Sequence, residues 1–595
     1  MLEPRQNAGR AGTGGVEWPV EPRLRGVAIE RLVALPCEAR SRWKIPPRAP
    51  SEFLRSVPGV HPLVVQILAN RDVTDPASVR AFLQADQVPL GDPLLMKGMP
   101  EAVERLARAV KEREPVVVYG DYDADGVTST TLLVSCLRTL GVPVSAFVPN
   151  RYEHGYGLNA QAVEDLARQT NLLVAVDCGV SALAEITRAR ELGVDVVVLD
   201  HHHVPQTLPP AEAVVNPHQD GCRYPFKDLC AVGLAYRFAQ ALFDRLGRDP
   251  AEADQWLDLV ALGTVADVVP LLGENRTLVA RGLAAINRSP RPGVRAMIEA
   301  ASFKRAVTAG NIGFGLAPRL NAPGRLTSAQ LSLDLLAATD EATARRLALR
   351  LEEVNRERQQ LTEAMRQHAA EILRARGELP KLVFVASDQF KSGIVGLVAG
   401  KLKDDYRRPS LVAEIVGEVA HGSARSIDEF HVARALAACD DLLLRHGGHA
   451  HAAGFTVARE RLDELRQRLE CLAAEQIPDS ALDSVLLADA EVRLDRLDPS
   501  ILVDLEALEP FGTANPTPTF VSRNLRVVSR ATVGASGQHL KLHLRDGQQV
   551  WEAVGWNLAD RAVTDVVDVA YQIERNEWNG QVTTRLKVVD FARAD

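Results

Sequence analysis

The sequence predicts an α/β fold: two α/β lobes joined by a long helix and followed by a β-rich module. Short apolar runs alternate with amphipathic helical stretches through the first half of the chain, a pattern typical of parallel sheets. Residues 333–375 then form a helical pattern without Gly or Pro, which favours a connecting helix over a helix pair. After residue 476, short segments such as 539–545 alternate with period two, which predicts a small barrel.

The first lobe is predicted from three buried strands, at 116–120, 172–176 and 196–199. Helices are expected between and around them, over the ranges 102–113, 129–140, 160–169 and 182–192. Nearly continuous apolar runs indicate strands that are buried on both faces of a parallel sheet.

Carboxylates and imidazoles follow each of these strands. They are Asp123, Asp125, Asp177, His201 and His202. Because ligands bind beyond the carboxyl ends of parallel strands, we expect the five side chains to converge at one edge of the sheet. So many anionic and imidazole groups need a cation to neutralise them. Their chemistry suits Mn²⁺ or Mg²⁺ better than a structural zinc ion.

Three further aspartates lie near this set. An apolar helix or strand at 256–265 leads to Asp267, which taken alone indicates only the end of a helix. Asp121 and Asp200 leave two roles open, as metal ligands or as supports. A carboxylate behind a metal-bound histidine fixes the tautomer of the imidazole, which favours the supporting role for Asp200.

At these residues the chain resembles the DHH phosphoesterase superfamily, and within it the RecJ family of 5′→3′ single-stranded-DNA exonucleases. The motifs that carry the resemblance occupy residues 119–126, 176–179, 200–202, 261–267, 392–396, 448–454 and 509–512. The sequence departs from the family in two ways. The given sequence stops shortly after the expected barrel, whereas some members continue into a further C-terminal domain, and it has an additional His203 for which we have no physical account.

The resemblance implies a division of the chain into domains. Residues 1–42 are expected to be a disordered extension, 43–332 a catalytic DHH domain and 333–378 the connecting helix. Residues 379–475 are expected to be a substrate-binding DHHA1 domain, and 476–595 an OB-fold barrel that binds nucleic acid. Pattern alone would allow any small barrel; Asn579-Gly580 predicts a hairpin turn within it.

The resemblance also implies the chemistry, a hydrolysis of DNA to 5′-mononucleotides in recombination and repair. Two divalent metals, Mn²⁺ or Mg²⁺, would activate water, so that no covalent enzyme intermediate is needed. The implied ligand and catalytic set is Asp123, Asp125, Asp177, His201, His202 and Asp267. Asp177 is the expected bridge between the metals, and His202 is either a ligand or a donor to the phosphoryl or leaving oxygen.

Substrate is expected to bind through cations, hydroxyls and open backbone, mainly from the second lobe. The candidate residues are Arg151, Arg325, Ser423, Arg425, Ser426 and His449. Arg325 is expected in a Pro-Gly loop, beside Arg319.

The composition is that of a soluble protein of several cores, with 46% hydrophobic residues and a formal charge of −8. DNA binding therefore requires a local basic surface. The 7 scattered cysteines predict reduced thiols in the cytoplasm, with Cys178 a packed residue and not a nucleophile. No membrane segment is expected. The resemblance implies a monomer that acts on single-stranded DNA with a helicase and single-strand-binding protein.

Two alternatives stay open on sequence. A DHH-type oligoribonuclease or adenosine-bisphosphate phosphatase shares both lobes, but such proteins have no barrel after them. A scaffold resembling the replication factors related to this family would have lost its ligands, whereas every candidate ligand is present here.

Overall fold

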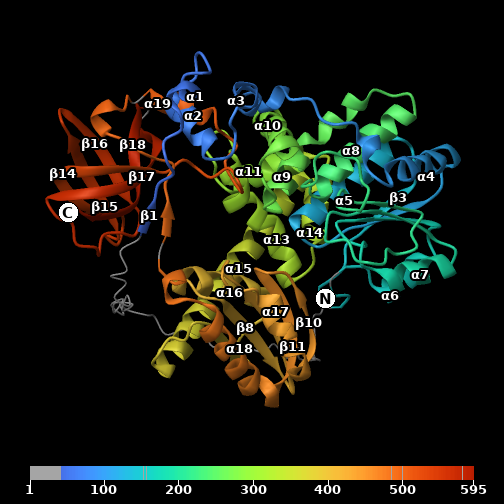
Figure 1. Ribbon diagram of the computed structural model, residues 1–595. Coiled ribbons are helices and arrows are strands. Elements are labelled where there is room, and N and C mark those ends of the chain that lie inside the picture. The colour runs from blue at the N-terminus through green and yellow to red at the C-terminus, as the bar shows by residue number, and fades with distance from the viewer. Residues whose placement is uncertain are drawn as a thin grey trace, which may run out of the picture. The chain divides into compact units, whose positions relative to one another are not determined.

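The computed structural model describes residues 42–594, except 152, 156, 484, 499, 579 and 580. Its ribbon is shown in Figure 1. The extension expected at the N-terminus lies almost wholly outside the described residues. Short 3-10 helices occur at η1 Ala85–Gln87, η2 Pro93–Leu95, η3 Pro250–Trp256, η5 Asp440–Leu442, η6 Arg459–Arg461, η7 Asp479–Ala481 and η8 Leu494–Arg496.

The first lobe is built on a parallel sheet in the order β3-β2-β4-β5-β6. Its strands are β2 Val116–Tyr119, β3 Val144–Phe147, β4 Leu172–Val176, β5 Asp195–Leu199 and β6 Ala213–Val215. The three predicted strands are therefore confirmed, and they are adjacent. Every residue of β2 and β4 is buried, as the continuous apolar runs indicated.

Helices surround this sheet. They are α4 Met99–Glu112, α5 Ala124–Thr139, α6 Ala160–Leu166, α7 Leu183–Glu191, α8 Ala231–Arg245, α9 Leu257–Ala266, α10 Gly273–Arg288, α11 Pro292–Ala300, α12 Ala309–Asn311, the π-helix η4 Ile312–Leu316, α13 Ala317–Leu326 and α14 Gln330–Ala337. The four predicted helices are present as α4 to α7. Only α5 differs substantially, because it begins at Ala124, inside the acidic motif, where Asp123 caps it.

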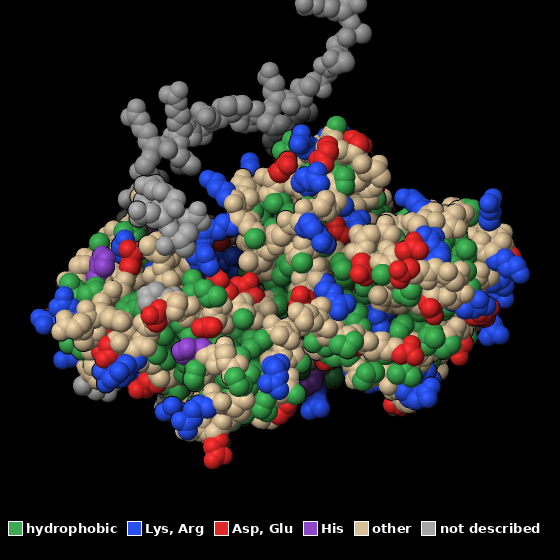
Figure 2. All heavy atoms as spheres, turned by 90° about the horizontal axis from the view of Figure 1, so that it is seen from above, with side chains coloured by type: hydrophobic (Ala, Val, Ile, Leu, Met, Phe, Trp, Pro, Cys, Tyr) green, Lys and Arg blue, Asp and Glu red, His purple; other side chains and the backbone are tan. Residues whose placement is uncertain are grey.

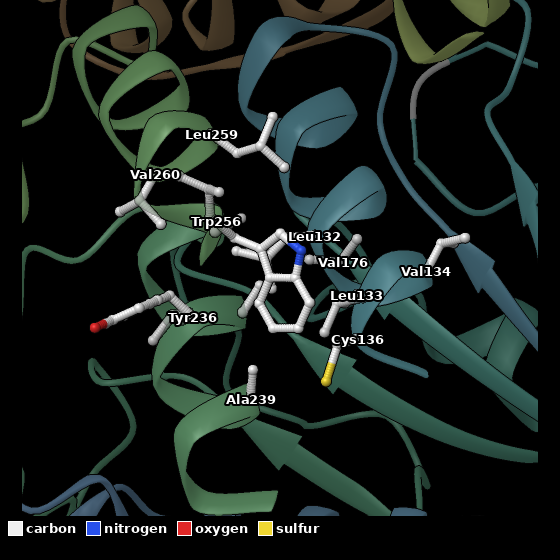
Figure 3. Close-up of a cluster of buried hydrophobic side chains, with 14 of the residues drawn as sticks. Leu132, Leu133, Val134, Cys136, Val176, Tyr236, Ala239, Trp256, Leu259 and Val260 are labelled. Atoms are coloured by element: carbon white, nitrogen blue, oxygen red, sulfur yellow. The ribbon is translucent and has the colours of Figure 1, made fainter. Parts of the chain in front are cut away.

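The core of the lobe lies between α5, α8, α9 and the sheet. In Figure 3, Trp256 projects among Leu132, Cys136 and Ala239. The Trp256 ring stacks on Phe243, with 5.9 Å between centroids. A smaller cluster that includes Tyr119, Ile186 and Val198 covers the opposite face of the sheet. Two packed faces hold the strand ends, and the residues after them, in fixed positions.

The long helix is α15, Glu341–Arg376, of 36 residues. The expected helix over 333–378 was wrong at its start, because α14 ends at Ala337 and α15 begins separately. Asp340 explains the break, since its side chain accepts a hydrogen bond from the Thr343 amide at 2.8 Å and so caps a new helix.

The second lobe contains a mixed sheet in the order β10-β11-β9-β8-β7. Its strands are β7 Val383–Ser387, β8 Ser410–Val416, β9 Val419–Arg425, β10 Leu443–Gly448 and β11 Ala452–Ala458, and its helices are α16 Ser392–Tyr406, α17 Val432–Ala437 and α18 Leu462–Gln476. Separate apolar clusters cover its two faces.

The C-terminal module is a closed barrel, because β14 pairs with both β15 and β17. Its elements are β13 Ala490–Glu491, α19 Ile501–Glu506, β14 Phe520–Val533, β15 His539–Asp546, β16 Gln549–Gly555, β17 Val566–Trp578 and β18 Gln581–Arg593. The hairpin turn predicted at Asn579-Gly580 lies outside the described residues, although the strands on both sides pair up to Trp578 and Gln581.

The start of the described chain packs mainly on this barrel, and it touches the first lobe at Phe82, whose carbonyl accepts from Arg276 at 3.0 Å. Strand β1, Arg42–Lys44, pairs with β12, Val485–Leu487. Helices α1 Ser51–Leu54, α2 Pro62–Ala69 and α3 Pro76–Leu83 follow. Val64 and Ile67 share one apolar cluster with Phe520 and Leu542, and in Figure 1 the blue helices lie beside the red strands. The assignment of residues 43–84 to the DHH domain therefore differs from their packing.

The six cysteines that the structure describes are free thiols. Among the described helices, none is both long enough and apolar enough to cross a membrane.

Candidate metal centre

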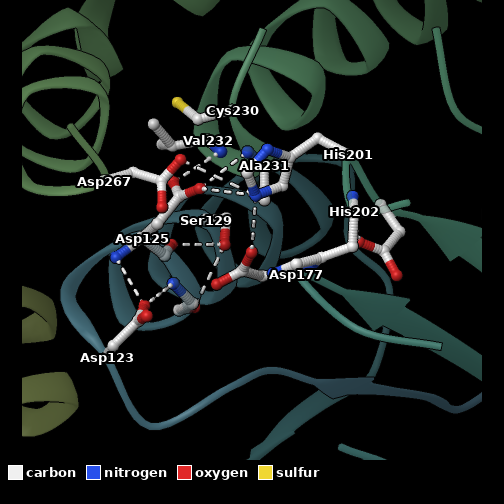
Figure 4. A network of polar contacts seen from close by, with 12 residues as sticks. Asp123, Asp125, Ser129, Asp177, His201, His202, Cys230, Ala231, Val232 and Asp267 are labelled. Atoms are coloured by element: carbon white, nitrogen blue, oxygen red, sulfur yellow. Dashed lines mark hydrogen bonds and ion pairs between the residues drawn. The ribbon is translucent and has the colours of Figure 1, made fainter. Parts of the chain in front are cut away.

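The strand ends β2, β4 and β5 bring the predicted side chains together, as Figure 4 shows. His201 is at their centre. Its Nε2 atom lies 3.3 Å from Oδ1 of Asp177, 3.7 Å from Oδ2 of Asp267 and 3.9 Å from Oδ2 of Asp125. One neutral imidazole within this distance of three carboxylates is the geometry expected around a cation.

Three groups of side chains have potential ligand atoms within 4.8 Å of one another. These groups are Asp121, Asp123 and Asp177; Asp125, His201 and Asp267; and Asp177, His201 and His202. Asp177 belongs to two of them and therefore lies where two adjacent groups of potential ligands meet.

Backbone amides fix the two carboxylates of the first acidic motif. Both oxygens of Asp125 accept hydrogen bonds from the first turn of α8, from the amides of Ala231 at 2.7 Å and Val232 at 2.9 Å. Asp123 accepts from the amides of Asp125 and Gly126 and so caps α5. A helix N-terminus favours negative charge, so these contacts stabilise carboxylates that burial would otherwise disfavour.

Close packing also requires Gly263, on α9. A Cβ atom there would lie 2.9 Å from Oδ1 of Asp125 and 2.4 Å from Oγ1 of Thr128. The glycine in the Gly263-Thr264 motif therefore lets α9 approach the buried carboxylate.

Asp177 lies in a strained conformation, because its φ of 61° is in the left-handed region. Oδ1 of Asp177, Nε2 of His201 and Oδ1 of Asp121 are all buried, and none has a hydrogen-bond partner among the described residues. Such orphaned buried atoms are costly and rare. A divalent cation would satisfy all three, so the residues fit a metal centre.

Without a metal, the crowded carboxylates hold protons. Burial, reinforced by the charge of Asp123, raises the pKa of Asp125 to about 7 and of Asp121 to about 8. Burial and the charge of Asp125 raise the pKa of Asp267 to about 9, and burial raises that of Asp177 well above its usual range. Binding of a cation would therefore displace protons.

The pKa values of the two adjacent histidines are shifted in opposite directions. Burial, with the charge of His202, lowers the pKa of His201 to about 4, so it is a neutral imidazole at pH 7. Burial also opposes charge on His202, but its hydrogen bond to Asp200 and the nearby carboxylates raise its pKa to about 9. Asp200 also accepts from the amides of Val180 and His202. Asp200 thus supports His202 and is not among the grouped ligand atoms.

Arginines gather beside the acidic cluster. The guanidinium of Arg151 lies 4.2 Å above the ring of Tyr122. Burial, together with the charges of Arg151, Arg358 and Arg425, lowers the pKa of Arg325 to about 10. Four cations that repel one another in a buried place need an anion. Sequence reasoning missed Arg358, whose position on the inward side of α15 was signalled by the buried polar neighbours Asn355 and Thr362.

Arg319 and Arg325 lie on the helix α13 and not around a loop, so the expected Pro-Gly loop was wrong. Pro323 is inside this helix. Gly324 permits it, because a Cβ atom there would lie 2.6 Å from the Tyr122 carbonyl oxygen. The side chain of Asn321 accepts from the Ala124 amide at 2.7 Å, which joins α13 to the acidic motif.

The candidates of the second lobe fall into two groups. Nη1 of Arg425 donates to Oγ of Ser423 at 3.1 Å, and both lie on β9. Ser426 is buried, and its hydroxyl donates to the Phe430 carbonyl at 2.5 Å. That hydrogen bond removes Ser426 from the set of phosphate ligands. His449 follows β10 and has an exposed side chain.

Cys178 is buried, and its burial raises the thiol pKa well above the usual range. The thiol therefore stays protonated, which agrees with the interpretation of Cys178 as a packed residue.

Family models match three regions of the chain: the N-terminal domain of the DHH family at residues 115–264, the DHHA1 domain at 379–475 and the RecJ OB domain at 488–590. A single-stranded-DNA-specific exonuclease RecJ from Dickeya dadantii is 36% identical over 571 residues, covering 91% of this chain and 97% of its own. The chain belongs to the RecJ family. Two solved RecJ structures from Thermus thermophilus support the same assignment. The Mn²⁺ complex has a TM-score of 0.82 at 31% identity and covers 94% of this chain and 80% of its own. For the Mg²⁺ complex these values are 0.76, 30%, 93% and 79%.

Proposed function

We propose that this RecJ-family protein is a metal-dependent exonuclease that degrades single-stranded DNA from its 5′ end to 5′-mononucleotides, in recombination and repair. One observation carries the proposal: a cluster of carboxylates and a neutral histidine with orphaned buried atoms lies beside a cluster of arginines. The first suits two divalent cations, Mn²⁺ or Mg²⁺, and the second suits phosphate. Relatives at 34% and 36% identity are named single-stranded-DNA-specific exonucleases.

The proposed ligands of one cation are Asp123 and Asp177, with Asp121 adjacent. Those of the other are Asp125, His201 and Asp267, and Asp177 is shared. When bound, such a pair of cations supplies an acidified water and stabilises negative charge on phosphoryl oxygens. The protein contributes a rigid donor set, because α5, α8 and three strand ends fix these side chains.

His202 has a separate role in the proposal. Its Nδ1 lies 2.7 Å from Oδ1 of Asp200, and its raised pKa keeps it protonated at pH 7 in the metal-free protein. This arrangement is suited to donating a hydrogen bond or proton to the phosphoryl or leaving oxygen, as a general acid does. Asp200 would orient the ring and maintain its charge.

The 5′→3′ direction of digestion would be set by the arginines. Arg151, Arg325 and Arg425, together with Arg358 and Ser423, form a site for the terminal 5′-phosphate. A guanidinium contact to phosphate contributes roughly 1.5–3 kcal/mol. A terminal phosphate is a dianion at neutral pH, whereas an internal phosphodiester carries one charge, so this cluster favours the end of a strand. His449 is proposed to contact substrate from the second lobe.

The barrel is proposed to hold the single strand. Figure 2 shows basic and acidic side chains interspersed over the visible face, so attraction must be local. Arg526 and Arg545 are direct cross-strand partners on β14 and β15. Both are exposed, and neither forms a salt bridge with a described residue. Like charges opposite one another are unfavourable unless an anion lies between them. Trp556 is 46% exposed, and an exposed ring can stack on a base.

The domain roles follow from this. Residues 85–332 would carry the chemistry, 379–475 the substrate contacts and the barrel the strand, with 43–84 as part of the barrel unit. Partners supplying single strands, a helicase and single-strand-binding protein, fit an enzyme that does not itself open duplexes. The free thiols favour the cytoplasm. We propose that the enzyme acts as a monomer.

The decisive experiment is digestion in Mn²⁺ of four substrates: single-stranded DNA, duplex DNA, short RNA and adenosine bisphosphate. Strong preference for 5′-phosphorylated single-stranded DNA, with mononucleotide products, is expected. Preferential cleavage of adenosine bisphosphate or short RNA would favour the phosphatase or oligoribonuclease alternative. Inactivity on all four, with no metal bound, would favour a scaffold.

A further inference from the structure

The carboxylate of Asp267 differs from its neighbours in how it is held. Asp123, Asp125 and Asp200 each accept hydrogen bonds from two backbone amides. No described residue donates a hydrogen bond to the Asp267 carboxylate. Its Oδ2 atom still lies 3.7 Å from Nε2 of His201. The orientation of Asp267 therefore depends on the backbone that carries it.

The backbone after Asp267 turns sharply and is then held by hydrogen bonds. Asp267 ends α9, and Val268 follows with a φ of 64°, an unfavourable value for a β-branched residue. The Pro270 carbonyl accepts from the side chain of Asn275 at 3.1 Å, and the Leu271 amide donates to the Thr513 carbonyl at 2.9 Å. Four residues after a proposed ligand, the chain is thus bonded to the barrel module.

Arg276 makes a second connection between the first lobe and the barrel module. It lies in α10 and is only 2% exposed. Its guanidinium donates to the carbonyls of Leu508 at 3.0 Å, Glu509 at 2.7 Å and Pro510 at 3.3 Å. It also lies 3.9 Å from the ring centre of Phe82. A buried cation that contacts successive carbonyls of one turn fixes that turn, because each lost contact would leave a charge unsolvated.

The turn itself, residues 507–516, is held by hydrogen bonds within it. The side chain of Asn515 donates to the carbonyls of Leu508 at 2.9 Å and Pro510 at 2.8 Å. Gly512 lies against Leu271, where a Cβ atom would come within 2.6 Å of its Cδ1. Leu271 is 1% exposed and cannot easily move away. A side chain at 512 would therefore displace the segment that follows Asp267.

We propose that the turn 507–516 of the barrel module is a brace that positions Asp267 for metal binding, acting through Leu271 and Arg276. Arg276 and Gly512 are positioning residues, remote from substrate. The inference rests on the proposed function only in taking Asp267 as a metal ligand. It gives the barrel a part in forming the metal centre, in addition to its part in holding DNA.

The test is Mn²⁺ binding without DNA, by titration calorimetry and by the electron paramagnetic resonance signal of free Mn²⁺, on Arg276→Gln. The matched control is Arg281→Gln on the same helix, which loses donations to the Asp86 and Val88 carbonyls but none to the turn. Displaced supports of metal ligands typically weaken binding about 10–100-fold. We expect Arg276→Gln to weaken one Mn²⁺ site at least about tenfold, Arg276→Lys to restore part of that loss, and Arg281→Gln to bind Mn²⁺ normally.

Normal Mn²⁺ affinity in a folded Arg276→Gln would overturn the proposal. If that variant does not fold, Gly512→Val replaces it, with Gly400→Val as control because a Cβ at 400 meets nothing within 4 Å. In active variants kcat should fall at saturating DNA while KM for DNA changes little; a change confined to KM would contradict the brace. Because the binding assay uses no DNA, it gives an answer even if the proposed exonuclease activity fails.

Discussion

Nδ1 of His202 lies 2.7 Å from Oδ1 of Asp200, and this carboxylate is buried directly behind the ring. The neighbouring His201 has no such carboxylate behind it among the described residues and faces three carboxylates through Nε2. Two consecutive histidines are thereby given different protonation states, one charged and one neutral at pH 7.

Replacing Asp200 by Asn should lower the pKa of His202 from about 9 toward its ordinary value, because the favourable charge is lost while the size is kept. The measurement is the titration of the imidazole signals by NMR in the metal-free protein. The rate should then decline with rising pH at a lower pH than in the wild type. An unchanged His202 titration would show that Asp200 does not hold the charge.

Asp177→Ala should lower the rate of cleavage by several orders of magnitude, because the proposed shared metal ligand is lost. The fold should remain, since the substitution removes a buried carboxylate whose Oδ1 has no hydrogen-bond partner among the described residues. Mn²⁺ stoichiometry and activity are measured together with circular dichroism. The exposed Asp220→Ala is the control. Near-normal activity of Asp177→Ala in Mn²⁺ would refute the two-metal assignment.

Metal should stabilise the protein more at about pH 8.5 than at about pH 6.5. In the metal-free fold the pKa values of Asp125, Asp121 and Asp267 are raised to about 7, 8 and 9. Between the ordinary carboxyl pKa and these raised values, the folded state binds more protons than the unfolded state. The free energy of unfolding therefore falls as pH rises through this range. His202, with its raised pKa, acts in the same direction.

Mg²⁺ replaces those protons and restores stability. The melting temperature with and without Mg²⁺ is therefore compared at the two pH values. A Mg²⁺-induced shift that is equal at both, or larger at the lower pH, would contradict the protonated cluster.

Arg358→Ala should reduce the preference for a 5′-phosphorylated over a 5′-hydroxyl strand at least several-fold, consistent with a loss of roughly 1.5–3 kcal/mol. Arg358 lies close enough to Arg325 to lower its pKa, whereas Arg356 on the same helix is exposed. Initial rates on the two 5′ ends are compared for both alanine variants. Equal preference in Arg358→Ala and Arg356→Ala would exclude Arg358 from the pocket.

Trp556→Ala should weaken binding to long single strands, because a lost stacking contact costs roughly 1–3 kcal/mol. Trp551 is 5% exposed, so Trp551→Ala should instead lower stability by roughly 3–5 kcal/mol. Arg526→Gln with Arg545→Gln should flatten the salt dependence by about one phosphate contact or more. Affinity measured against salt decides, and unchanged affinity and slope would assign these residues to another role.

Point variants are preferable here to deleting the barrel. A chain ending near Ala474 would lose the residues that cover Val64 and Ile67, and would leave Arg276 without its carbonyl partners. Loss of binding in such a chain would not distinguish a DNA contact from a damaged fold.

The sequence predicted that the side chains of the metal centre converge, because strand ends are a local signal. Parallel strands place their carboxyl ends together, so Asp177 and His201 could be brought together from apolar runs alone. The start of α5 was less predictable. Asp123 and Asp125 resemble a loop in sequence, whereas the structure uses one as a cap and the other within the first turn.

Tertiary contacts decided what the sequence left open. Pro323-Gly324 indicates a loop by local propensity, but packing against Tyr122 overrides it. Ser426 differs from Ser423 because it is buried and its hydroxyl donates to the Phe430 carbonyl, whereas the Ser423 hydroxyl accepts from Arg425. The attachment of residues 43–84 to the barrel had no local signal, since pairing between strands so far apart in the chain leaves no periodicity to detect.

That attachment has a consequence for how the chain is made. Trp43 pairs with Leu486, and its indole nitrogen donates to Asp590 at 2.7 Å, on β18, the last strand of the barrel. On the ribosome the first lobe can fold as its sequence emerges, whereas the apolar side of α2 has no partner until the barrel is complete. Closing so long a loop is slow. The earliest part of the described chain can therefore complete its apolar packing only after the barrel has been synthesised.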